Sequence, residues 1–542
     1  MSADRHFDVV VIGAGAAGLY SLHRLRGLGL SVRVFEQGGG VGGTWYWNRY
    51  PGARCDVESW DYCYSFSEEL EQEWDWSERY PTQAELERYF NHVADRFDLR
   101  RDIELNTRVE QARFDEDRNL WIISSPGGAT VSARYLVSAA GCLSEVYQPR
   151  IAGAHTFAGE QHHTARWPAG GVDVADKRVG VVGTGSSGVQ VIPQVAKQAA
   201  HVFVFQRTAQ YAIPAHNRPL DDDTRNELKG SFHQRQAYKR TTRMGMSTPP
   251  PEVSSALDVD EAIRTDILEA AWKRGGLAFP GTFDDIGTNA ESNRYVAEFV
   301  RDKIRARIKA PEVADTVLDI DHAFGARRPI VDIDYFETYN RGNVTLVDVG
   351  AAPITEINPR GLRTTEGAYD LDVLVYATGF DGMTGALLSM DIRGVDGLTL
   401  RDKWSGGACT YLGLVASGFP NLFMITGPGS PAVFSNVILS IEQHVEWIAD
   451  CLAHMGVHGL DRIDAEPEAE AGWTRQVEVL AARSVVGKTN SWWTGSNIPG
   501  KPQGVTMYLG GAQNYRRACD EIAADGYRGF ALTRSAGAVI AS

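Results

Sequence analysis

The stretch DVVVIGAGAAG, residues 8–18, decides the fold, and RVGVVGTGSSG, residues 178–188, repeats its pattern. In both, an apolar β-branched run leads into glycines spaced Gly-x-Gly-x-x-Gly: Gly13, Gly15 and Gly18, then Gly183, Gly185 and Gly188. This spacing permits a tight turn and lets the backbone approach a pyrophosphate at a helix N-terminus. One such motif is a weak indication, because glycine turns are common. Two, each in strand–turn–helix context, predict two dinucleotide sites between which electrons pass.

The residues that follow the two motifs predict different nucleotides. After the first motif, an apolar strand at 32–35 ends in Glu36, whose carboxylate suits a ribose diol. After the second, the strand at 202–205 leads to Arg207 and no acid, and a guanidinium matches a 2′-phosphate bidentately. We therefore expect FAD at the first site and NADPH at the second. The alternative is that Glu36 and Arg207 are surface charges at strand ends.

Composition agrees with a globular enzyme. The chain has 542 residues, 43% of them hydrophobic, and a net charge of −15, which disfavours nucleic acid or an anionic membrane as the main partner. Its six cysteines form no Cys-x-x-Cys pair, so we expect no metal site and free thiols, as in the cytoplasm. We find neither a signal segment nor an apolar run of membrane-spanning length. We expect a monomer or weak homo-oligomer.

The order of patterns along the chain predicts an α/β fold with two Rossmann-like dinucleotide-binding domains and a mostly helical insertion. Helical spacing covers 83–97, and short strands are expected at 103–113 and 120–124. Apolar strands ending in small residues recur at 133–141 and 371–380, and a further buried strand enters a glycine loop at 421–430. We assign 1–142 and 381–542 to the FAD domain, 143–214 and 328–380 to the NADPH domain, and 215–327 to the insertion.

Longer motifs resemble one enzyme family. Residues 43–56 read GTWYWNRYPGARCD, and residues 157–168 follow the spacing Phe-x-Gly-x-x-x-His-x-x-x-Trp-Pro. Both resemble, position for position, the flavin-dependent Baeyer–Villiger monooxygenases. The segments ATGFD, GPGSP, EQHVEW and SWWTGSNIPGKP extend the resemblance over nearly the whole chain. The set is most similar to the phenylacetone, steroid and cyclohexanone monooxygenase subgroup.

This resemblance implies a mechanism and a set of site residues. In the family, NADPH reduces FAD, the reduced flavin captures O₂ as a C4a-peroxide, and attack on a ketone gives an ester or lactone. The implied catalytic residues are Arg328 and the aspartate that positions it, Asp56. Arg327, where relatives often have lysine, would add a second cation for the 2′-phosphate. His163 is implied to act indirectly, and Cys142 would lie near the flavin without a redox role.

The complete set of expected contacts follows from the motifs and the resemblance together. The residues expected at FAD are Gly13, Gly15, Gly18, Glu36, Gly43, Thr44, Trp45 and Asp56. The residues expected at NADPH are Gly183, Thr184, Gly185, Ser186, Ser187, Gly188, Arg207, Thr208, Arg327 and Trp492. The residues expected to border the ketone are Val433, Phe434 and Val437.

Simpler interpretations remain for some of these residues. Arg327 and Arg328 are alternatively a solvated basic pair, and Trp492 a surface aromatic on a mobile loop. Two rival functions also remain: a flavin monooxygenase acting on sulfur or nitrogen, and a non-catalytic FAD- and NADPH-binding regulator. The motif at 43–56 and Arg328 disfavour both, and sulfoxidation is expected as a side reaction. The motifs do not specify which ketone is oxidised.

Overall fold

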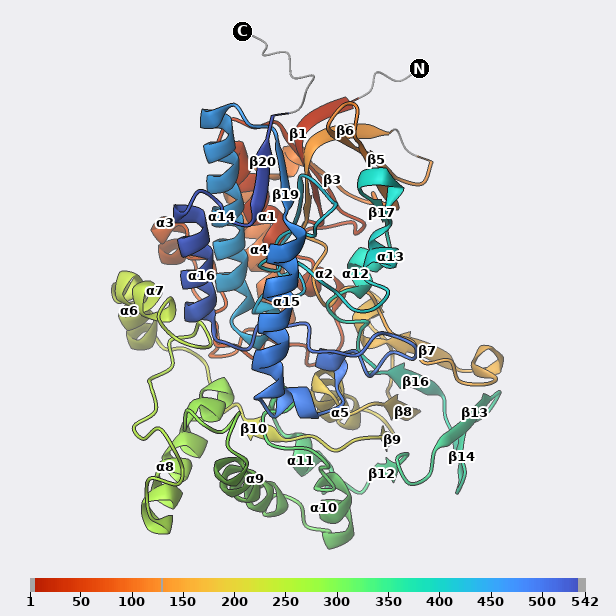
Figure 1. The fold of residues 1–542 in the computed structure, drawn as a ribbon. Coiled ribbons are helices and arrows are strands. Elements are labelled where there is room, and N and C mark those ends of the chain that lie inside the picture. Colours follow the sequence, from red (N-terminus) through yellow and green to blue (C-terminus); the bar gives the residue numbers. More distant parts are fainter. Residues whose placement is uncertain (1–4, 128–129, 535–542) are drawn as a thin grey trace.

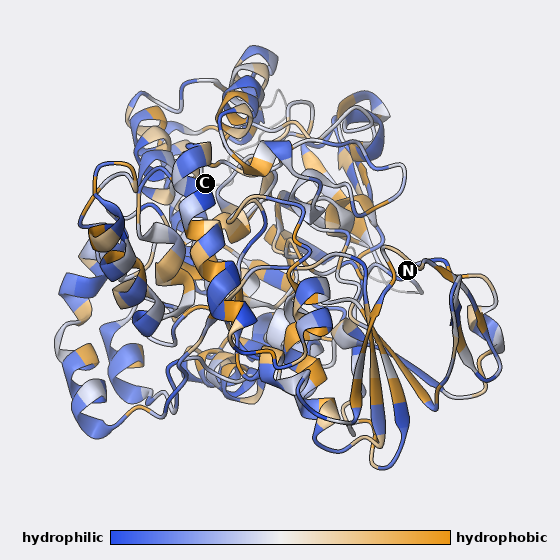
Figure 2. Cartoon of the chain, turned by 90° about the horizontal axis from the view of Figure 1, so that it is seen from below, coloured by the Kyte–Doolittle hydropathy of each residue, from blue (hydrophilic) through white to orange (hydrophobic). Residues whose placement is uncertain are grey.

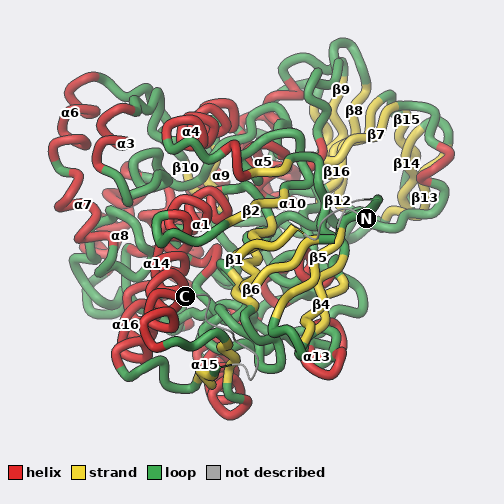
Figure 3. The backbone as a smooth tube through the Cα atoms, turned by 90° about the horizontal axis from the view of Figure 1, so that it is seen from above, coloured by secondary structure: helices red, strands yellow, loops and turns green. Residues whose placement is uncertain are grey.

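Two main sheets, each carrying one glycine motif, organise the protein (Figure 1). The computed structural model describes residues 5–127 and 130–534. Seen from above, the strands lie on one side of the molecule and most helices gather on the other (Figure 3). The predicted class, two Rossmann-like α/β domains with a mostly helical insertion, is confirmed by this arrangement.

The first sheet has eight strands and is parallel at its centre. In spatial order they are β17 (Asp391–Arg393), β4 (Gln111–Asp115), β5 (Leu120–Ser124), β6 (Val131–Ser138), β1 (Arg5–Ile12), β2 (Val32–Phe35) and β3 (Ile103–Glu104), with β18 (Leu422–Met424) also paired to β6. Val9, Val10 and Val11 of β1 are fully buried. Such a continuous apolar run is typical of a parallel strand covered on both faces. The first glycine turn therefore leaves the sheet from a rigid central strand.

The C-terminal part of the chain returns to this first sheet. β18 pairs in parallel with β6, with Leu422 opposite Leu136, and β17 pairs with β4. The long helix α14 (Val437–His458) then packs on α1 (Ala16–Arg26), where Arg24 and Asp450 form an ion pair. α15 (Pro467–Ala482) and α16 (Ala512–Ala524) follow α14, and α16 packs on it. One sheet is thus built from both ends of the chain.

The second sheet is parallel throughout. Its five strands run in the order β12 (Val344–Asp348), β9 (His201–Gln206), β8 (Arg178–Val182), β16 (Val373–Tyr376) and β7 (Glu160–His163). The second glycine turn joins β8 to α5 (Ser186–Ala196). A small antiparallel sheet of β13 (Ile354–Asn358), β14 (Gly361–Thr364) and β15 (Ala368–Asp370) extends from its edge. In parallel sheets, the loops after the strands form the ligand crevice.

Residues 215–327 contain five α-helices: α6 (Asp222–Gly230), α7 (Phe232–Lys239), α8 (Glu261–Arg274), α9 (Ala290–Arg305) and α10 (Pro311–Val317). The side chain of Asn289 caps α9, whose Val296, Val300 and Ile304 are fully buried in the core of the second sheet. β10 (Ala212–Pro214) and β11 (Ile330–Asp332) pair in parallel on either side of this segment. That pairing brings residue 328 close to the point where the insertion leaves the chain.

The other α-helices and strands are α4, with 14 residues, and several shorter elements. They are α2 (Thr44–Trp47), α3 (Glu68–Glu73), α4 (Gln83–Arg96), α11 (Tyr335–Thr338), α12 (Gly385–Leu388), α13 (Leu400–Lys403), β19 (Arg462–Ala465) and β20 (Phe530–Thr533). The single strand predicted for 103–113 is wrong, because the chain forms β3 and β4 with a loop between them. In that loop Asn106 has a φ of +55°, which no strand residue adopts.

Hydrophobic and hydrophilic residues are distributed differently over the strands and the outer helices. Figure 2 shows hydrophobic residues along the strands and hydrophilic residues on the outer helices. Within the described ranges, no helix combines the length and apolar character required to cross a membrane. The same ranges hold no cluster of three metal-ligating side chains.

Candidate active site

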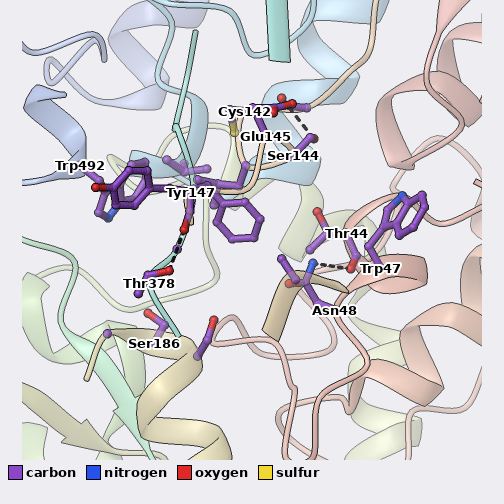
Figure 4. A pocket seen from close by; sticks show the side chains of 18 of the residues that line it. Thr44, Trp47, Asn48, Cys142, Ser144, Glu145, Tyr147, Ser186, Thr378 and Trp492 are labelled. Atoms are coloured by element: carbon purple, nitrogen blue, oxygen red, sulfur yellow. Dashed lines mark hydrogen bonds between the residues drawn. The ribbon is translucent and has the colours of Figure 1, made fainter. Parts of the chain in front are cut away.

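A single cavity of about 1060 Å³ joins the two glycine turns. Its walls include these predicted residues: Gly13, Gly15, Glu36, Gly43, Thr44, Trp45, Asp56, Gly183, Thr184, Gly185, Ser186, Ser187, Arg207, Thr208, Arg327, Arg328, Val433, Val437 and Trp492. Three predicted residues lie outside the walls: Gly18, Gly188 and Phe434. In Figure 4, Trp492 enters from one side, and Thr44, Trp47 and Asn48 face it from the other.

The first turn fits a pyrophosphate. Gly13 has a φ of +102°, and α1 begins immediately after Gly15, which offers no side-chain cap. The first N–H groups of α1 are therefore left for an anion. Gly18 acts differently, because a Cβ there would lie 1.8 Å from the Gly13 oxygen. Its role is to let the helix pack on the turn, not to touch the ligand.

Glu36 follows β2 and lines the cavity, and the residue is 5% exposed. It accepts hydrogen bonds from the backbone N–H of Ala14 at 2.8 Å and of Gly38 at 2.7 Å. Burial raises the pKa of Glu36, and both N–H donors oppose that shift. Each carboxylate oxygen keeps a lone pair for a hydroxyl donor. This hydrogen-bond acceptor suits a ribose diol and repels a phosphate.

The helix α2 closes the first turn from the other side. A Cβ on Gly43 would lie 2.8 Å from Gly15 Cα, so glycine is needed there for the two backbones to approach. Trp45 is buried, and its indole N–H donates to the Tyr62 hydroxyl at 3.1 Å. These contacts fix the floor of the cavity between the two sheets.

The second turn reproduces the first. Gly183 has a φ of +109°, and Gly185 precedes α5 without a side-chain cap, with ψ −169° against −168° at Gly15. A Cβ on Gly188 would lie 2.2 Å from the Gly183 oxygen, so this glycine also serves helix packing. A Cβ on Gly185 would meet no protein atom within 4 Å. The open space beside Gly185 fits a second dinucleotide.

Arg207 and Arg327 place positive charge beside this second turn. Arg207 follows β9 and is exposed, and it forms no ion pair or hydrogen bond with another described residue. Burial lowers the pKa of Arg327, the nearby carboxylate of Asp321 opposes that shift, and Arg207 adds to it. Two neighbouring guanidinium groups without a bonded anion suit a phosphate dianion.

Arg328 and Asp56 form a bidentate ion pair in the cavity wall. Nε of Arg328 donates to Asp56 at 2.6 Å and Nη2 donates at 2.9 Å, while Nη1 donates to the Val433 oxygen at 2.8 Å. Burial disfavours the charged guanidinium, but the Asp56 carboxylate outweighs that cost and raises the pKa of Arg328. The cation is thus permanent and has a fixed direction.

His163 lies at the end of β7 and makes only structural contacts. Its Nδ1 accepts from the Ala165 N–H at 3.0 Å, so Nε2 carries the proton and faces the Thr378 hydroxyl at 3.2 Å. Thr378 donates in turn to the Tyr147 carbonyl at 2.7 Å (Figure 4). Burial lowers the pKa of His163 to about 4. A neutral imidazole held this way positions the loops after β7 and β16.

The loop at 432–437 lies between Arg328 and the C-terminal segment. Val433 and Val437 line the cavity. Phe434 does not, because its ring packs toward Trp493, at 6.4 Å between centroids, and toward Arg243, at 5.9 Å from the guanidinium. The expectation that this loop borders the site therefore applies to the two valines and not to the phenylalanine in this structure.

The Trp492 loop, defined as residues 490–501, contributes Asn490, Ser491, Trp492, Ser496 and Asn497 to the cavity wall. Trp492 lines the cavity and packs closely on Gly382, while Trp493 is buried beneath it. A capping box between Ser491 and Thr494 shapes the turn. The interpretation of Trp492 as a free surface aromatic does not fit this packing.

Sequence reasoning missed several wall residues, among them Tyr147, Arg166, Thr378, Thr426, Asn490 and Asn497. Arg166, Thr378 and Asn497 lie within the segments that carry the family resemblance but were assigned no role there, and Tyr147, Thr426 and Asn490 lie outside those segments. Cys142 lines the cavity, and burial raises the pKa of its thiol to about 11, so it stays protonated. All six cysteines are free.

The geometry of the cavity indicates the class of protein, a flavoprotein oxidoreductase that binds two dinucleotides in one cavity. A family model described as pyridine nucleotide-disulphide oxidoreductase matches residues 10–257. The chain is 42% identical to the acetone monooxygenase (methyl acetate-forming) of Gordonia sp. (strain TY-5), over 97% of this chain and 99% of that protein. It is 43% identical to a Baeyer–Villiger monooxygenase of Pseudooceanicola batsensis, over 98% and 97%.

Solved structures agree with these relatives. A steroid monooxygenase bound to NADP is 50% identical with a TM-score of 0.93, covering 98% of this chain and 100% of that one. A closed structure of cyclohexanone monooxygenase is 42% identical with a TM-score of 0.95 and the same coverage. The chain belongs to the Baeyer–Villiger monooxygenases, the FAD-containing, NADPH-using family that the motifs resemble.

Proposed function

We propose that this protein uses NADPH and O₂ to convert ketones into esters or lactones, with Arg328 as the catalytic cation. The observation that carries the proposal is the Arg328–Asp56 pair, placed in the one cavity that both glycine turns share. A regulator that only bound the two nucleotides would have no use for a half-buried, oriented guanidinium in the cavity that both turns share.

Bound FAD, once reduced by NADPH, supplies the activation of O₂ that inserts one oxygen atom beside the ketone carbonyl. The protein supplies charge, orientation and exclusion of water. Negative charge develops on the carbonyl oxygen during the reaction, and a fixed guanidinium stabilises it without reorganising. Two hydrogen bonds to Asp56 hold that guanidinium in a fixed plane. A third hydrogen bond, donated by Nη1 to the Val433 carbonyl, restrains its other terminal nitrogen.

We assign the two nucleotides by charge. Glu36, with two backbone donors already bound, is assigned to the ribose of FAD, and Arg207 with Arg327 to the 2′-phosphate of NADPH. The segments 1–142 and 381–542 would form the FAD domain, and 143–214 with 328–380 the NADPH domain. Strands β17 and β18, which join the first sheet, support that division. Arg207→Ala should raise the NADPH KM about tenfold and leave NADH unchanged.

The substrate class is supported by the wall beside Arg328. Val433, Val437 and Ile441 give it an apolar lining next to one oriented cation. Such a site binds a molecule with an apolar body and a single carbonyl acceptor. A ketone has this form, and a charged amine or a carboxylate does not.

One relative favours a second candidate. A phenazine N-monooxygenase of Lysobacter antibioticus is 42% identical over 99% of this chain and 99% of that protein. Oxidation at an aromatic nitrogen therefore belongs in any test, and so does the expected sulfoxidation side reaction. Nitrogen and sulfur attack the oxidant directly and need no stabilised carbonyl oxyanion, so the Arg328–Asp56 pair favours the ketone.

The deciding experiment is a substrate panel with the FAD-loaded protein. Small, cyclic, aryl and steroid ketones, a thioether and phenazine are each incubated with NADPH and air, and products are quantified by mass spectrometry. We expect ester or lactone in proportion to the NADPH consumed. N-oxide or sulfoxide alone would support the second candidate, and hydrogen peroxide with every compound would support a non-catalytic or uncoupled flavoprotein.

We further propose a monomer or weak homo-oligomer in the cytoplasm. The free cysteines support a reducing compartment, and the net charge of −15 disfavours self-association. Light scattering on the FAD-loaded protein measures the mass directly, with 59.4 kDa expected for one chain.

A further inference from the structure

A chain of buried hydrogen bonds leads from the cavity wall to helix α16. The backbone N–H of Thr426, two residues after β18, donates to Nδ1 of His444 at 2.9 Å. Nε2 of His444 lies 2.9 Å from the Tyr515 hydroxyl, which donates to the Leu412 carbonyl at 2.6 Å. All four residues are at most 5% exposed, and among them only Thr426 lines the cavity.

This geometry determines where each proton lies. Nδ1 of His444 accepts a hydrogen bond from Thr426, so the imidazole is neutral and carries its proton on Nε2. The Nε2–H group therefore donates to the Tyr515 oxygen, and the Tyr515 hydroxyl donates to Leu412. Every donor in the chain points the same way, and neither ring is left with an unpaired polar atom.

Both ends of the chain are strained backbone positions. Thr426 has a φ of +53° and Leu412 has a φ of +59°. A left-handed conformation is costly for a β-branched or bulky residue, and such residues concentrate at active sites, where the surrounding structure holds them. The two turns also lie against each other, because a Cβ on Gly427 would lie 2.4 Å from the Gly413 oxygen. His444 and Tyr515 thus bridge two strained turns that are in contact.

Thr426 lies at the edge of the first sheet where FAD is assigned. β18 pairs with β6, and β6 pairs with β1, whose carboxyl end carries the first glycine turn. The carboxyl ends of parallel strands meet at one edge, where a dinucleotide binds. Thr426 also neighbours Cys142, since its side chain influences the pKa of that thiol, and both residues line the cavity. A shift of Thr426 would therefore change the surroundings of the bound FAD.

We infer that His444 is a positioning residue, which holds Thr426 in its left-handed conformation beside the FAD through the acceptor at Nδ1. The inference rests on the proposed FAD site and goes beyond it, because His444 lies behind the wall of the cavity and does not line it. Tyr515 supports this role by accepting from Nε2–H, which keeps Nδ1 free of a proton. A substitution of His444 should therefore affect the flavin only when the Nδ1 acceptor is lost.

Two amide substitutions separate the two nitrogens of His444. In His444→Asn, the amide oxygen is as many bonds from the backbone as Nδ1, so it can still accept from Thr426 while the contact with Tyr515 is lost. In His444→Gln, the amide group is as many bonds from the backbone as Nε2, so it can still reach Tyr515 while the acceptor for Thr426 is lost. Both substitutions remove the ring and leave the charge unchanged.

The bound flavin reports the position of Thr426. FAD content, thermal unfolding and the visible circular dichroism of FAD are measured without ketone. Both variants should unfold at lower temperature, because each leaves a buried polar group without a partner. Only His444→Gln should change the flavin dichroism, and its kcat for ester should fall about fivefold at unchanged KM, the worth of one hydrogen bond. His458→Gln, at the exposed end of α14, is the matched control and should behave as the wild type.

Two further substitutions keep the test decisive if His444→Gln does not fold. Tyr515→Phe retains the bond between Thr426 and His444, so it should lower the unfolding temperature and leave the flavin dichroism unchanged. Glycine adopts the left-handed conformation without strain. In a double-mutant cycle, His444→Gln should therefore change the flavin dichroism much less beside Thr426→Gly than beside threonine.

Equal changes of flavin dichroism in His444→Asn and His444→Gln would overturn the inference, and so would no change in either at full FAD content. A change in Tyr515→Phe as large as in His444→Gln would overturn it too, because the effect would then follow the stability of the core. The dichroism requires no product, so these results are distinct from a failure to make ester. Full FAD content in Gly15→Val would instead overturn the assigned FAD site.

Discussion

Asp56 holds Arg328 by two parallel hydrogen bonds between residues 272 positions apart in the sequence. The aspartate lies in the loop after α2, and the arginine lies two residues before β11, just after the helical segment 215–327. Their pairing therefore joins two distant segments of the chain in the wall of the cavity that both glycine turns line. The ion pair therefore forms only when the segments that carry the two residues are assembled around one cavity.

Removing this cation should uncouple the enzyme. Arg328→Ala should retain FAD and accept hydride from NADPH, while ester formation falls about a hundred- to a thousandfold, the usual cost of a lost oxyanion donor. NADPH consumption and hydrogen peroxide are measured alongside ester. Asp56→Asn should give a milder form of the same uncoupling, because it weakens the orientation of Arg328 and leaves the positive charge of Arg328 in place. Normal coupling in Arg328→Ala would remove Arg328 from the mechanism.

Placing a side chain in each glycine turn should impair the binding of a different cofactor. A Cβ on Gly185 meets no protein atom within 4 Å, so Gly185→Val should fold, keep FAD and lose NADPH affinity by more than about tenfold. Gly15→Val should instead lose FAD. Flavin absorbance per protein and NADPH titration measure the two effects. Full FAD and unchanged NADPH affinity in both variants would contradict both site assignments.

Substrate size should respond to the valines more than to the phenylalanine. Val437 lines the cavity, so Val437→Phe should shift relative rates toward smaller ketones. Phe434→Ala removes a ring that packs toward Trp493, so its main effect should be on the Trp492 loop and on coupling. Rates over a fixed ketone panel measure the ranking. A larger change of ranking in Phe434→Ala than in Val437→Phe would place the ring in the pocket.

Stability should fall on acidification through His163. Burial lowers its pKa from 6.5 to about 4, so between these two pH values His163 is mostly protonated in the unfolded chain and mostly neutral in the folded chain. Folding stability is then lost as pH falls from about 6.5 toward 4 and changes no further below that. By pH 5 the loss is on the order of 2 kcal/mol.

Thermal unfolding of the FAD-loaded protein between pH 7.5 and 5 checks this. His163→Gln should be less sensitive to pH than the wild type, and His155→Gln, which changes an exposed histidine, should match the wild type. Equal sensitivity in all three proteins would show that His163 does not carry the effect.

Local patterns in the sequence predicted the framework of the fold. The valine runs before Gly13 and Gly183, and the glycine spacing after them, are local signals, so β1, β8 and both turns follow from neighbouring residues. The strand predicted over 103–113 failed for the opposite reason. Its β-branched residues are interrupted by Asn106 in a left-handed conformation, and the loop around it is set by backbone hydrogen bonds from Asn106 to Gly38 and from Thr107 to Glu36.

Contacts between distant residues could not be predicted in this way. Family motifs named Arg328 and Asp56, but the hydrogen bond from Arg327 to the Asn490 carbonyl spans 163 residues and carries no motif. The orientation of Phe434 away from the cavity likewise depends on Trp493 and Arg243, which come from two other segments. Side-chain direction at such places is decided by packing partners that only the assembled fold supplies.

Isotope labelling tests the central claim most directly. The FAD-loaded protein is incubated with NADPH, a ketone and ¹⁸O₂ in unlabelled water, and the product is analysed by mass spectrometry. The account predicts an ester or lactone carrying one ¹⁸O atom per molecule, formed in proportion to the NADPH consumed. Unlabelled ketone recovered intact, with all of the ¹⁸O in hydrogen peroxide across the whole ketone panel, would contradict it.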